Sequence, residues 1–105
     1  MAPHEDDVSE LVRRIVDTVQ PLRVILFGSA ARGSVRPDSD VDLLIVMPEG
    51  THRRRTAQHL YRMLAGAGIP FDLIVATPSD LERQKNNVGL VYYTIIREGV
   101  TVYAA

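Results

Sequence analysis

The chain has 105 residues, of which 46% are hydrophobic and 24% are charged, a balance typical of one globular domain and not of a disordered segment. Its formal net charge of −1 offers no general attraction to nucleic acid or to anionic lipid, so we expect neither direct nucleic-acid binding nor membrane association. The absence of cysteine excludes disulfides, thiolate catalysis and cysteine-based zinc sites, and the acidic first residues and short apolar runs predict a cytoplasmic protein.

Apolar residues recur at helical spacing in some segments and form short continuous runs in others, which predicts helices alternating with buried strands. In chain order, we expect a helix over residues 8–19, strands over 23–27 and 41–47, a helix over 51–66, a strand over 71–75, a short helical segment from 77, a helix from about 87 to 98 and a short strand over 100–103. The connection across residues 28–40 is too short for a helical crossover, so the first two strands should be antiparallel. The expected fold class is α/β, a single-domain mixed β-sheet flanked by helices.

The turn that follows the first predicted strand suits phosphate binding. Gly28 permits a tight turn, and the N–H groups of a glycine turn or of a helix start donate to phosphate oxygens. Ser29 adds a hydroxyl donor, and Arg32 adds a guanidinium about one helical turn further on. Because many strand-to-helix connections contain Gly-Ser, this turn alone is a weak indication, and the pattern of a Walker loop is absent.

Three aspartates beside apolar strands strengthen that interpretation. Asp40 and Asp42 are two residues apart, so along a strand they project from one face at a separation of about 7 Å, and Asp72 lies in the third predicted strand. A solvated strand end explains any single aspartate better, but three in apolar surroundings next to a phosphate-binding turn favour a metal site. Oxygen ligands suit Mg²⁺ or Mn²⁺, which complete their coordination with water and substrate phosphates. The residues therefore indicate metal-assisted transfer from a nucleoside triphosphate.

These motifs resemble those of the nucleotidyltransferase superfamily of DNA polymerase beta. The matching segments are Phe27-Gly28-Ser29, a ten-residue spacer that contains Ala31-Arg32-Gly33, then Asp40-Val41-Asp42-Leu43, and later Phe71-Asp72-Leu73. In length the chain also resembles the minimal nucleotidyltransferases (the MNT-type branch), which are often the antitoxin of a pair with a helical HEPN-domain toxin. The resemblance implies a polymerase beta palm-like fold and one minimal nucleotidyltransferase domain over residues 1–105.

The resemblance assigns nucleotide binding to the turn. Gly28 and Ser29 would hold the β- and γ-phosphates, with Arg32 as a helper. In the antitoxin branch the donor is ATP and the acceptor is typically a tyrosine of the partner toxin. The implied activity is that of a metal-dependent protein adenylyltransferase, which transfers AMP to its HEPN-domain partner and acts as the antitoxin of a toxin–antitoxin pair.

The resemblance assigns metal binding and catalysis to the three aspartates. Asp40 and Asp42 would bind the metal that accompanies the triphosphate and, together with Asp72, a second metal beside the acceptor hydroxyl. Two Mg²⁺ or Mn²⁺ ions are therefore expected. Asp72 would also be placed to accept the proton of the acceptor hydroxyl.

Two other functions stay open. A non-catalytic binding module would neutralise a partner by covering its surface, and a small-molecule nucleotidyltransferase would modify an antibiotic such as an aminoglycoside. The absence of an acceptor-binding domain from these 105 residues argues against the second. No residue in the sequence selects adenine over another base.

In two predicted helical segments, the role of the side chains can be interpreted in more than one way. At the start of helix 51–66, the basic run His52–Arg55 is interpreted as solvated surface, with contact to an acidic partner or a phosphate as the alternative. Residues 88–96 are apolar almost all round, which favours core packing, while an exposed patch there would fit a homodimer or a toxin complex. The residues of helix 51–66 predicted to point inward are Ala57, Leu60, Tyr61 and Leu64.

Overall fold

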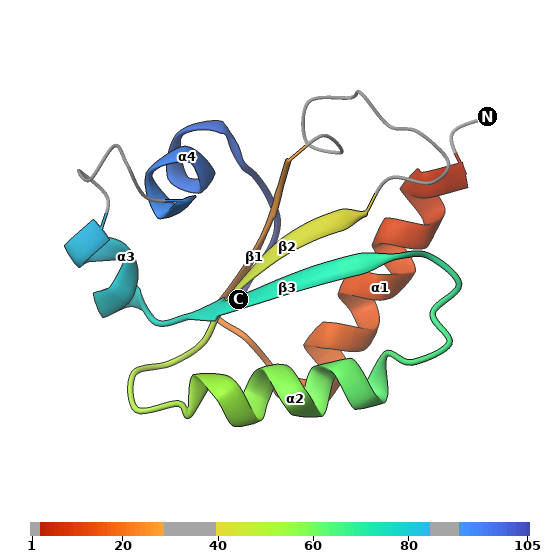
Figure 1. Cartoon of the computed structure of the whole chain (residues 1–105), viewed down its shortest axis with the longest axis horizontal. Helices are drawn as coiled ribbons and strands as arrows, with labels where there is room; N and C mark the ends of the chain where they lie inside the picture. Colours follow the sequence, from red (N-terminus) through yellow and green to blue (C-terminus); the bar gives the residue numbers. More distant parts are fainter. Residues whose placement is uncertain (1–2, 29–39, 85–90) are drawn as a thin grey trace.

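The structure is a computed structural model that describes residues 3–28, 40–84 and 91–105 (Figure 1). Within those ranges the elements, in chain order, are α1 (Pro3–Val19), β1 (Arg23–Phe27), β2 (Val41–Val46), α2 (Arg53–Met63), β3 (Phe71–Ala76), α3 (Pro78–Gln84), α4 (Val91–Glu98) and β4 (Val100–Ala104). The predicted helices and strands are thus present in the predicted order. In the described parts of the chain, no helix has both the length and the apolar character needed to cross a membrane.

The strands form one mixed sheet in the order β3-β2-β1-β4. β1 pairs antiparallel with β2 and with β4, whereas β2 and β3 are parallel. The antiparallel pairing of β1 with β2 confirms the prediction made from their short connection. The parallel pair has the longer connection that it requires, because α2 carries the chain back between β2 and β3.

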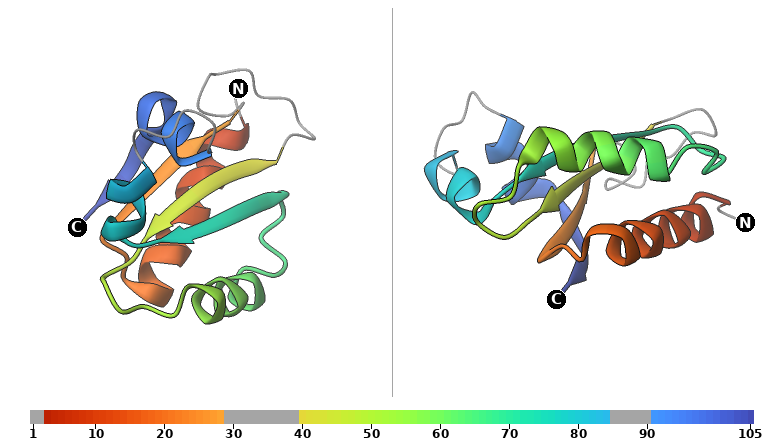
Figure 2. Two further views of the ribbon diagram at one scale, coloured as in Figure 1. Left: turned by 60° about the vertical axis from the view of Figure 1, so that its left-hand side comes forward. Right: turned by 90° about the horizontal axis from the view of Figure 1, so that it is seen from below.

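Helices cover both faces of the sheet: α1 and α2 pack on one face, and α3 and α4 on the other (Figure 2). Because side chains alternate along a strand, β1, β2 and β3 each contribute to both cores, whereas β4 reaches only the core under α1 and α2, through Tyr103. The core under α1 and α2 consists of Leu11, Val12, Ile15, Val24, Val41, Leu43, Ile45, Met47, Leu60, Leu64, Leu73 and Val75. The smaller core on the other face consists of Ile25, Leu44, Val46, Ala76 and Ile95.

The inward face of α2 agrees with the prediction except at one residue. Leu60 and Leu64 are fully buried, and Ala57 packs against their core. Tyr61, however, is 40% exposed, so the prediction that it points into the core is wrong. Its ring instead stacks on Phe71 at the start of β3, with the ring centroids 5.5 Å apart.

The apolar run 88–96 contributes to the core through Ile95, which is 1% exposed. The side chains on which an exposed patch for a partner was expected lie outside the described part of the chain. The core-packing interpretation is therefore confirmed at Ile95.

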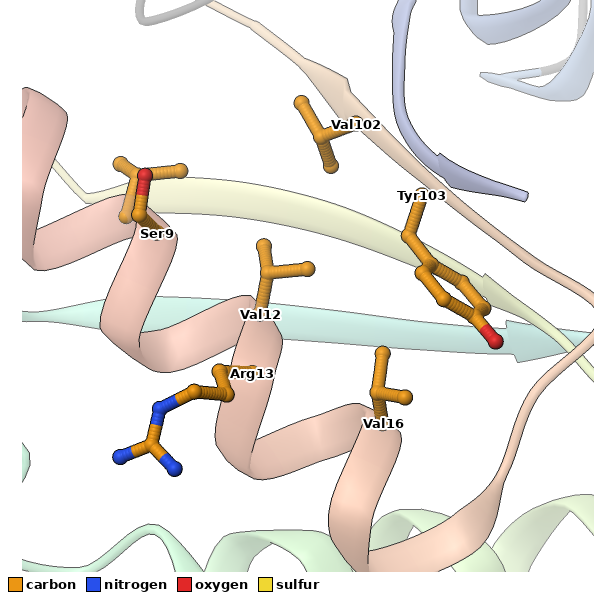
Figure 3. A pocket seen from close by; sticks show the side chains of 7 residues that line it. Ser9, Val12, Arg13, Val16, Val102 and Tyr103 are labelled. Carbon is orange, nitrogen blue, oxygen red and sulfur yellow. The ribbon is translucent and has the colours of Figure 1, made fainter. Parts of the chain in front are cut away.

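An apolar groove of about 480 Å³ lies between α1 and β4 (Figure 3). Its walls include Val12 and Val16 of α1 and Val102 and Tyr103 of β4. β4 is an edge strand, and β3 forms the opposite edge of the sheet. None of the candidate site residues lines this groove.

The basic run at the start of α2 has a structural role. His52 is the N-cap residue of α2, and its Nδ1 atom accepts a hydrogen bond of 3.2 Å from the backbone N–H of Arg55. Arg53 donates from Nη1 to Oδ1 of Asp80 at 2.9 Å, whereas Arg54 is exposed. The interpretation as solvated surface is therefore incomplete for Arg53, which also holds α2 against α3.

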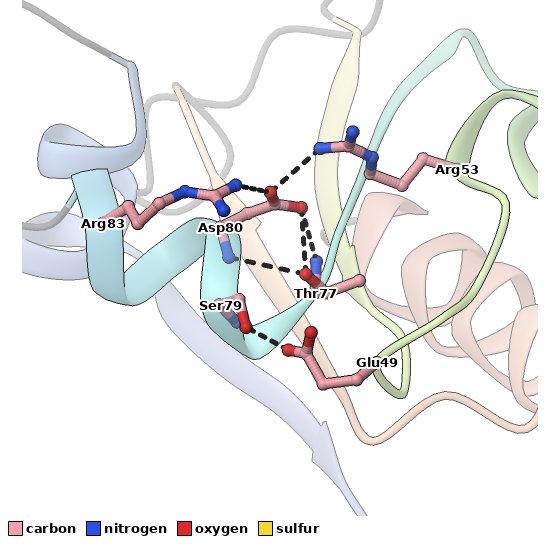
Figure 4. Close-up of polar contacts among 6 residues, drawn as sticks. All are labelled: Glu49, Arg53, Thr77, Ser79, Asp80 and Arg83. Carbon is pink, nitrogen blue, oxygen red and sulfur yellow. Dashed lines mark hydrogen bonds and ion pairs between the residues drawn. The ribbon is translucent and has the colours of Figure 1, made fainter.

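Asp80 joins α2 to α3 through a buried carboxylate (Figure 4). Besides Arg53, its Oδ1 atom accepts a hydrogen bond of 2.7 Å from Arg83, and its Oδ2 atom accepts bonds from the N–H and hydroxyl groups of Thr77. Burial by itself would raise the pKa of Asp80, but the hydrogen bonds from Thr77 and the charge of Arg53 bring the pKa below its usual value. Asp80 is therefore held as a carboxylate in the folded state.

Replacing Asp80 with asparagine should lower the free energy of unfolding by about 2 kcal/mol at pH 7, because the amide no longer accepts charge-assisted hydrogen bonds on both atoms. The pKa of Asp80 is lower in the folded protein than its unfolded value of about 3.9, so the carboxylate stabilises the fold above about pH 3.9. This stabilisation is lost as the pH falls through the folded pKa. The difference in the free energy of unfolding between the parent protein and Asp80→Asn should therefore become smaller below about pH 4.

Urea denaturation followed by circular dichroism at pH 7 and pH 3 measures both effects. Asp17→Asn is the matched control, because Asp17 is exposed and its closest cation, Arg13, lies 3.5 Å away. This control should cost less than about 0.5 kcal/mol at either pH. An equal loss for Asp80→Asn at both pH values would contradict the assigned role of the carboxylate.

Candidate functional site

Two of the predicted site residues, Asp42 and Asp72, lie side by side. They occupy the second position of β2 and of β3 and are register partners across this parallel pair. Neighbouring strands are about 4.8 Å apart, and paired residues project from the same face of a sheet. Alternation along β2 places Asp42 on the face of Leu44 and Val46, the face covered by α3 and α4. The fold therefore brings together two carboxylates that are separated by α2 in the sequence.

Asp40 stands just before β2 and is exposed. It is close enough for its charge to act on Asp42. Within residues 3–28, 40–84 and 91–105, no three histidine or acidic side chains are grouped closely enough to hold a metal ion together. The structure thus pairs Asp42 with Asp72 and leaves Asp40 at the margin of the pair.

The environment of Asp42 disfavours its negative charge. Burial raises the pKa of this carboxyl, and the nearby charges of Asp72 and Asp40 raise it further. A bound cation would reverse this effect, since it compensates for desolvation and for the repulsion between the carboxylates. Paired carboxylates also fit Mg²⁺, which is usually held by one or two of them together with water and substrate phosphates. The donor set therefore fits a divalent metal of this kind.

Gly28 lies directly against the Asp42 carboxylate. It follows β1, whose last residue, Phe27, is the register partner of Asp42. Its φ angle of 76° is in the region that favours glycine, and a Cβ atom placed there would collide with Oδ2 of Asp42. The turn predicted for phosphate binding thus also makes room for the carboxylate. The other two residues predicted to bind nucleotide, Ser29 and Arg32, lie outside the described residues.

Tyr61 belongs to the site, although sequence reasoning did not select it. Its hydroxyl donates a hydrogen bond of 2.8 Å to Oδ1 of Asp72 and accepts one of 2.9 Å from the backbone N–H of Leu73. Burial raises the pKa of Tyr61, and the adjacent Asp72 raises it further against the lowering effect of the Leu73 N–H. The available signal was a tyrosine at a helical position where packing alone would be served by phenylalanine.

The fold has close counterparts among solved structures. The crystal structure of "a putative nucleotidyltransferase from Sulfolobus solfataricus" is 22% identical, with a TM-score of 0.64 over 94% of this chain and 78% of that one. The crystal structure of a "toxin-antitoxin with AMP-PNP" is also 22% identical, with a TM-score of 0.65 over 96% of this chain and 73% of that one. These likenesses establish the fold, which is the α/β fold of nucleotidyltransferases.

The family follows from the sequence itself. Residues 6–98 match the family model described as the nucleotidyltransferase domain. The chain therefore belongs to the nucleotidyltransferase domain family, within the polymerase beta-like superfamily. No curated protein matches the chain.

Proposed function

We propose that this protein transfers a nucleoside monophosphate, AMP from ATP, to a hydroxyl group of a partner protein. The observation that carries the proposal is the pairing of Asp42 with Asp72 in register on parallel strands, with the pKa of Asp42 raised by burial and by its acidic neighbours. Such a pair serves a reaction in which a metal and a triphosphate supply the missing positive charge and the remaining ligands. Membership of the nucleotidyltransferase domain family supports the same reaction.

The roles of the residues follow from their positions. Asp42 and Asp72, with Asp40 beside them, would hold the divalent metal, which supplies charge neutralisation at the triphosphate. The Gly28 turn, which has no side chain, lets the chain approach both Asp42 and a phosphate closely, and Ser29 would donate to a phosphate oxygen.

Asp72 is the proposed proton acceptor. It is exposed, so an incoming hydroxyl can reach it, and a carboxylate in that position can accept the proton of the hydroxyl. The acceptor oxygen forms a bond to the α-phosphorus, the bond from the α-phosphorus to the bridging oxygen breaks, and pyrophosphate leaves. The proton of the acceptor hydroxyl passes to Asp72. Backbone N–H groups of the glycine turn would stabilise the charge that develops on the phosphate.

For the acceptor we propose a tyrosine of a HEPN-domain toxin, which makes this chain the antitoxin of the pair. A structure of similar fold is that of a toxin–antitoxin with AMP-PNP, which supports both a protein partner and an adenine nucleotide. The alternative is an antitoxin that acts by binding alone. The Asp42→Asn variant distinguishes this alternative from the proposed enzyme. A binding module would still protect cells with that substitution, whereas an enzyme would not.

Incubation with the protein encoded beside this chain and with Mg²⁺ and ATP labelled at the α-phosphate should label that partner. ATP labelled at the γ-phosphate should leave the partner unlabelled, because the reaction releases the β- and γ-phosphates as pyrophosphate. Gel autoradiography and the mass of the partner, increased by one or more AMP groups, measure the transfer. Absence of label from all four nucleoside triphosphates, or label that persists in EDTA, would contradict the proposed function.

A further inference from the structure

Tyr61 connects α2 to the acidic pair through a hydroxyl held on both sides. β3 is an edge strand, so the N–H of Leu73 that faces away from β2 has no strand partner, and it donates to the Tyr61 hydroxyl oxygen at 2.9 Å. The same hydroxyl donates to Oδ1 of Asp72 at 2.8 Å. Because a hydroxyl has a single proton and here accepts from an amide, its proton is directed at the carboxylate.

The ring of Tyr61 is also fixed. It stacks on Phe71 with the ring centroids 5.5 Å apart and the ring planes inclined by 17°, so the aromatic pair holds the ring beside the start of β3. A phenylalanine would keep this stacking. The hydroxyl therefore has a purpose other than packing, and its partner is the carboxylate at the second position of β3.

Asp72 is exposed on an edge strand, where an aspartate side chain ordinarily samples several rotamers. One hydrogen bond to Oδ1 selects a single arrangement. Among the described residues, Tyr61 is the one whose side chain binds this carboxylate, so Oδ2 stays available for another ligand.

We propose that Tyr61 is a positioning residue that holds the Asp72 carboxylate in the orientation required for metal binding and for proton acceptance. This inference rests on the proposed function, which gives Asp72 those tasks. Residues that orient a metal ligand through a hydrogen bond typically change metal affinity or activity by about 10- to 100-fold when they are removed. Tyr61 would act in this way on Asp72 while contacting neither the nucleotide nor the acceptor.

The test compares Tyr61→Phe with the parent protein and with Tyr103→Phe. Tyr103 is on β4, at the other edge of the sheet, so its substitution removes a hydroxyl far from Asp72. Three-bond NMR couplings of the Asp72 side chain measure its rotamer directly, without nucleotide, partner or metal. A titration with Mn²⁺, followed by the electron paramagnetic resonance signal of the free ion, measures metal affinity, and labelled transfer measures kcat and KM for ATP.

For Tyr61→Phe we expect Asp72 couplings averaged over rotamers, a Mn²⁺ dissociation constant raised about 10-fold, and a kcat lowered about 10- to 100-fold with little change in KM. Tyr103→Phe should match the parent in all three. Unchanged Asp72 couplings in Tyr61→Phe would overturn the positioning role, as would parent-like Mn²⁺ binding. A mass increase of one AMP on Tyr61 itself would also overturn it, because the hydroxyl would then be an acceptor.

The two proposals fail in different ways. If the parent protein neither binds Mn²⁺ nor transfers a nucleotide, while Tyr61→Phe still averages the Asp72 rotamers, the proposed function is overturned and the orienting hydrogen bond is supported. If the parent is active and Tyr61→Phe is equally active with the same Mn²⁺ affinity, the positioning role is overturned and the proposed function stands.

Discussion

Replacing Asp42 with asparagine should reduce nucleotidyl transfer by at least about 10³-fold and, at the same time, make the metal-free protein harder to unfold. Loss of one carboxylate from a pair that holds a metal removes several kcal/mol of charge stabilisation, and each 1.4 kcal/mol is a factor of ten in rate. Yet the folded protein holds this carboxylate where burial and the charges of Asp72 and Asp40 oppose its ionisation. An amide of the same shape carries none of that cost.

The expected gain in the free energy of unfolding at pH 7 is about 1 kcal/mol, after allowing for the partial exposure of Asp42. For a domain of this size that corresponds to a rise in melting temperature of about 4 °C or more. The pH dependence follows from the sign of the shift. The pKa of Asp42 is higher in the folded protein than its unfolded value of about 3.9, so the titration of this carboxyl favours folding below about pH 3.9. That contribution is lost as the pH rises through the folded pKa. The advantage of the variant should therefore disappear at about pH 3.

Thermal and urea unfolding in EDTA at pH 7 and pH 3 measures the gain, and the labelled-transfer assay measures the loss of activity. Asp17→Asn, an exposed substitution on α1, controls for the change in net charge and should alter neither. A variant that is less stable than the parent at pH 7 would show that the Asp42 carboxylate stabilises the fold. If the activity of the variant is within about tenfold of that of the parent, Asp42 is not part of the proposed site.

The prediction of the fold from sequence succeeded where one physical requirement dominated. Short apolar runs and helical periodicity located the strands and helices, and the short connection across residues 28–40 required β1 and β2 to be antiparallel. The helix predicted over residues 51–66 is shorter in the structure. It begins after the N-cap residue His52 and ends before Leu64, whose backbone N–H bonds to Leu60. Residues next to a helix can keep its apolar spacing without being part of it.

The candidate site was predictable as a set of residues but not as an arrangement. Local sequence shows that Asp42 and Asp72 belong to different strands, whereas their register depends on how α2 returns the chain to the sheet. Two contacts have no periodic signal at all, because they join residues far apart in sequence: Arg53 with Asp80, and Gly28 with Asp42. The prediction that Tyr61 points into the core failed for a related reason. Helical spacing identifies the side of α2 that faces the sheet, but it does not show that a large ring on that side stacks on a residue of the edge strand β3.

Replacing Gly28 with alanine should lower the free energy of unfolding by about 3 kcal/mol and reduce nucleotidyl transfer strongly. Two costs add: a side chain at a φ angle of 76° costs about 1 kcal/mol, and a methyl group that meets the Asp42 carboxylate costs about 1–3 kcal/mol more. Relief of the collision requires movement of the Asp42 side chain or of the turn. Either movement disturbs the pairing with Asp72 on which the proposed chemistry depends.

Gly66→Ala separates the two costs, because Gly66 has a similar φ angle of 81° but no atom within 4 Å of an added Cβ. The free energy of unfolding of this control should fall by only about 1 kcal/mol, and its activity should equal that of the parent. A double-mutant cycle completes the argument: in an Asp42→Ala background the collision is absent, so Gly28→Ala should cost no more than Gly66→Ala. Urea denaturation of the four proteins in the cycle gives the coupling energy between Gly28 and Asp42. A coupling close to zero would mean that Gly28 is required for its backbone conformation alone, and that its contact with the carboxylate has no part in shaping the site.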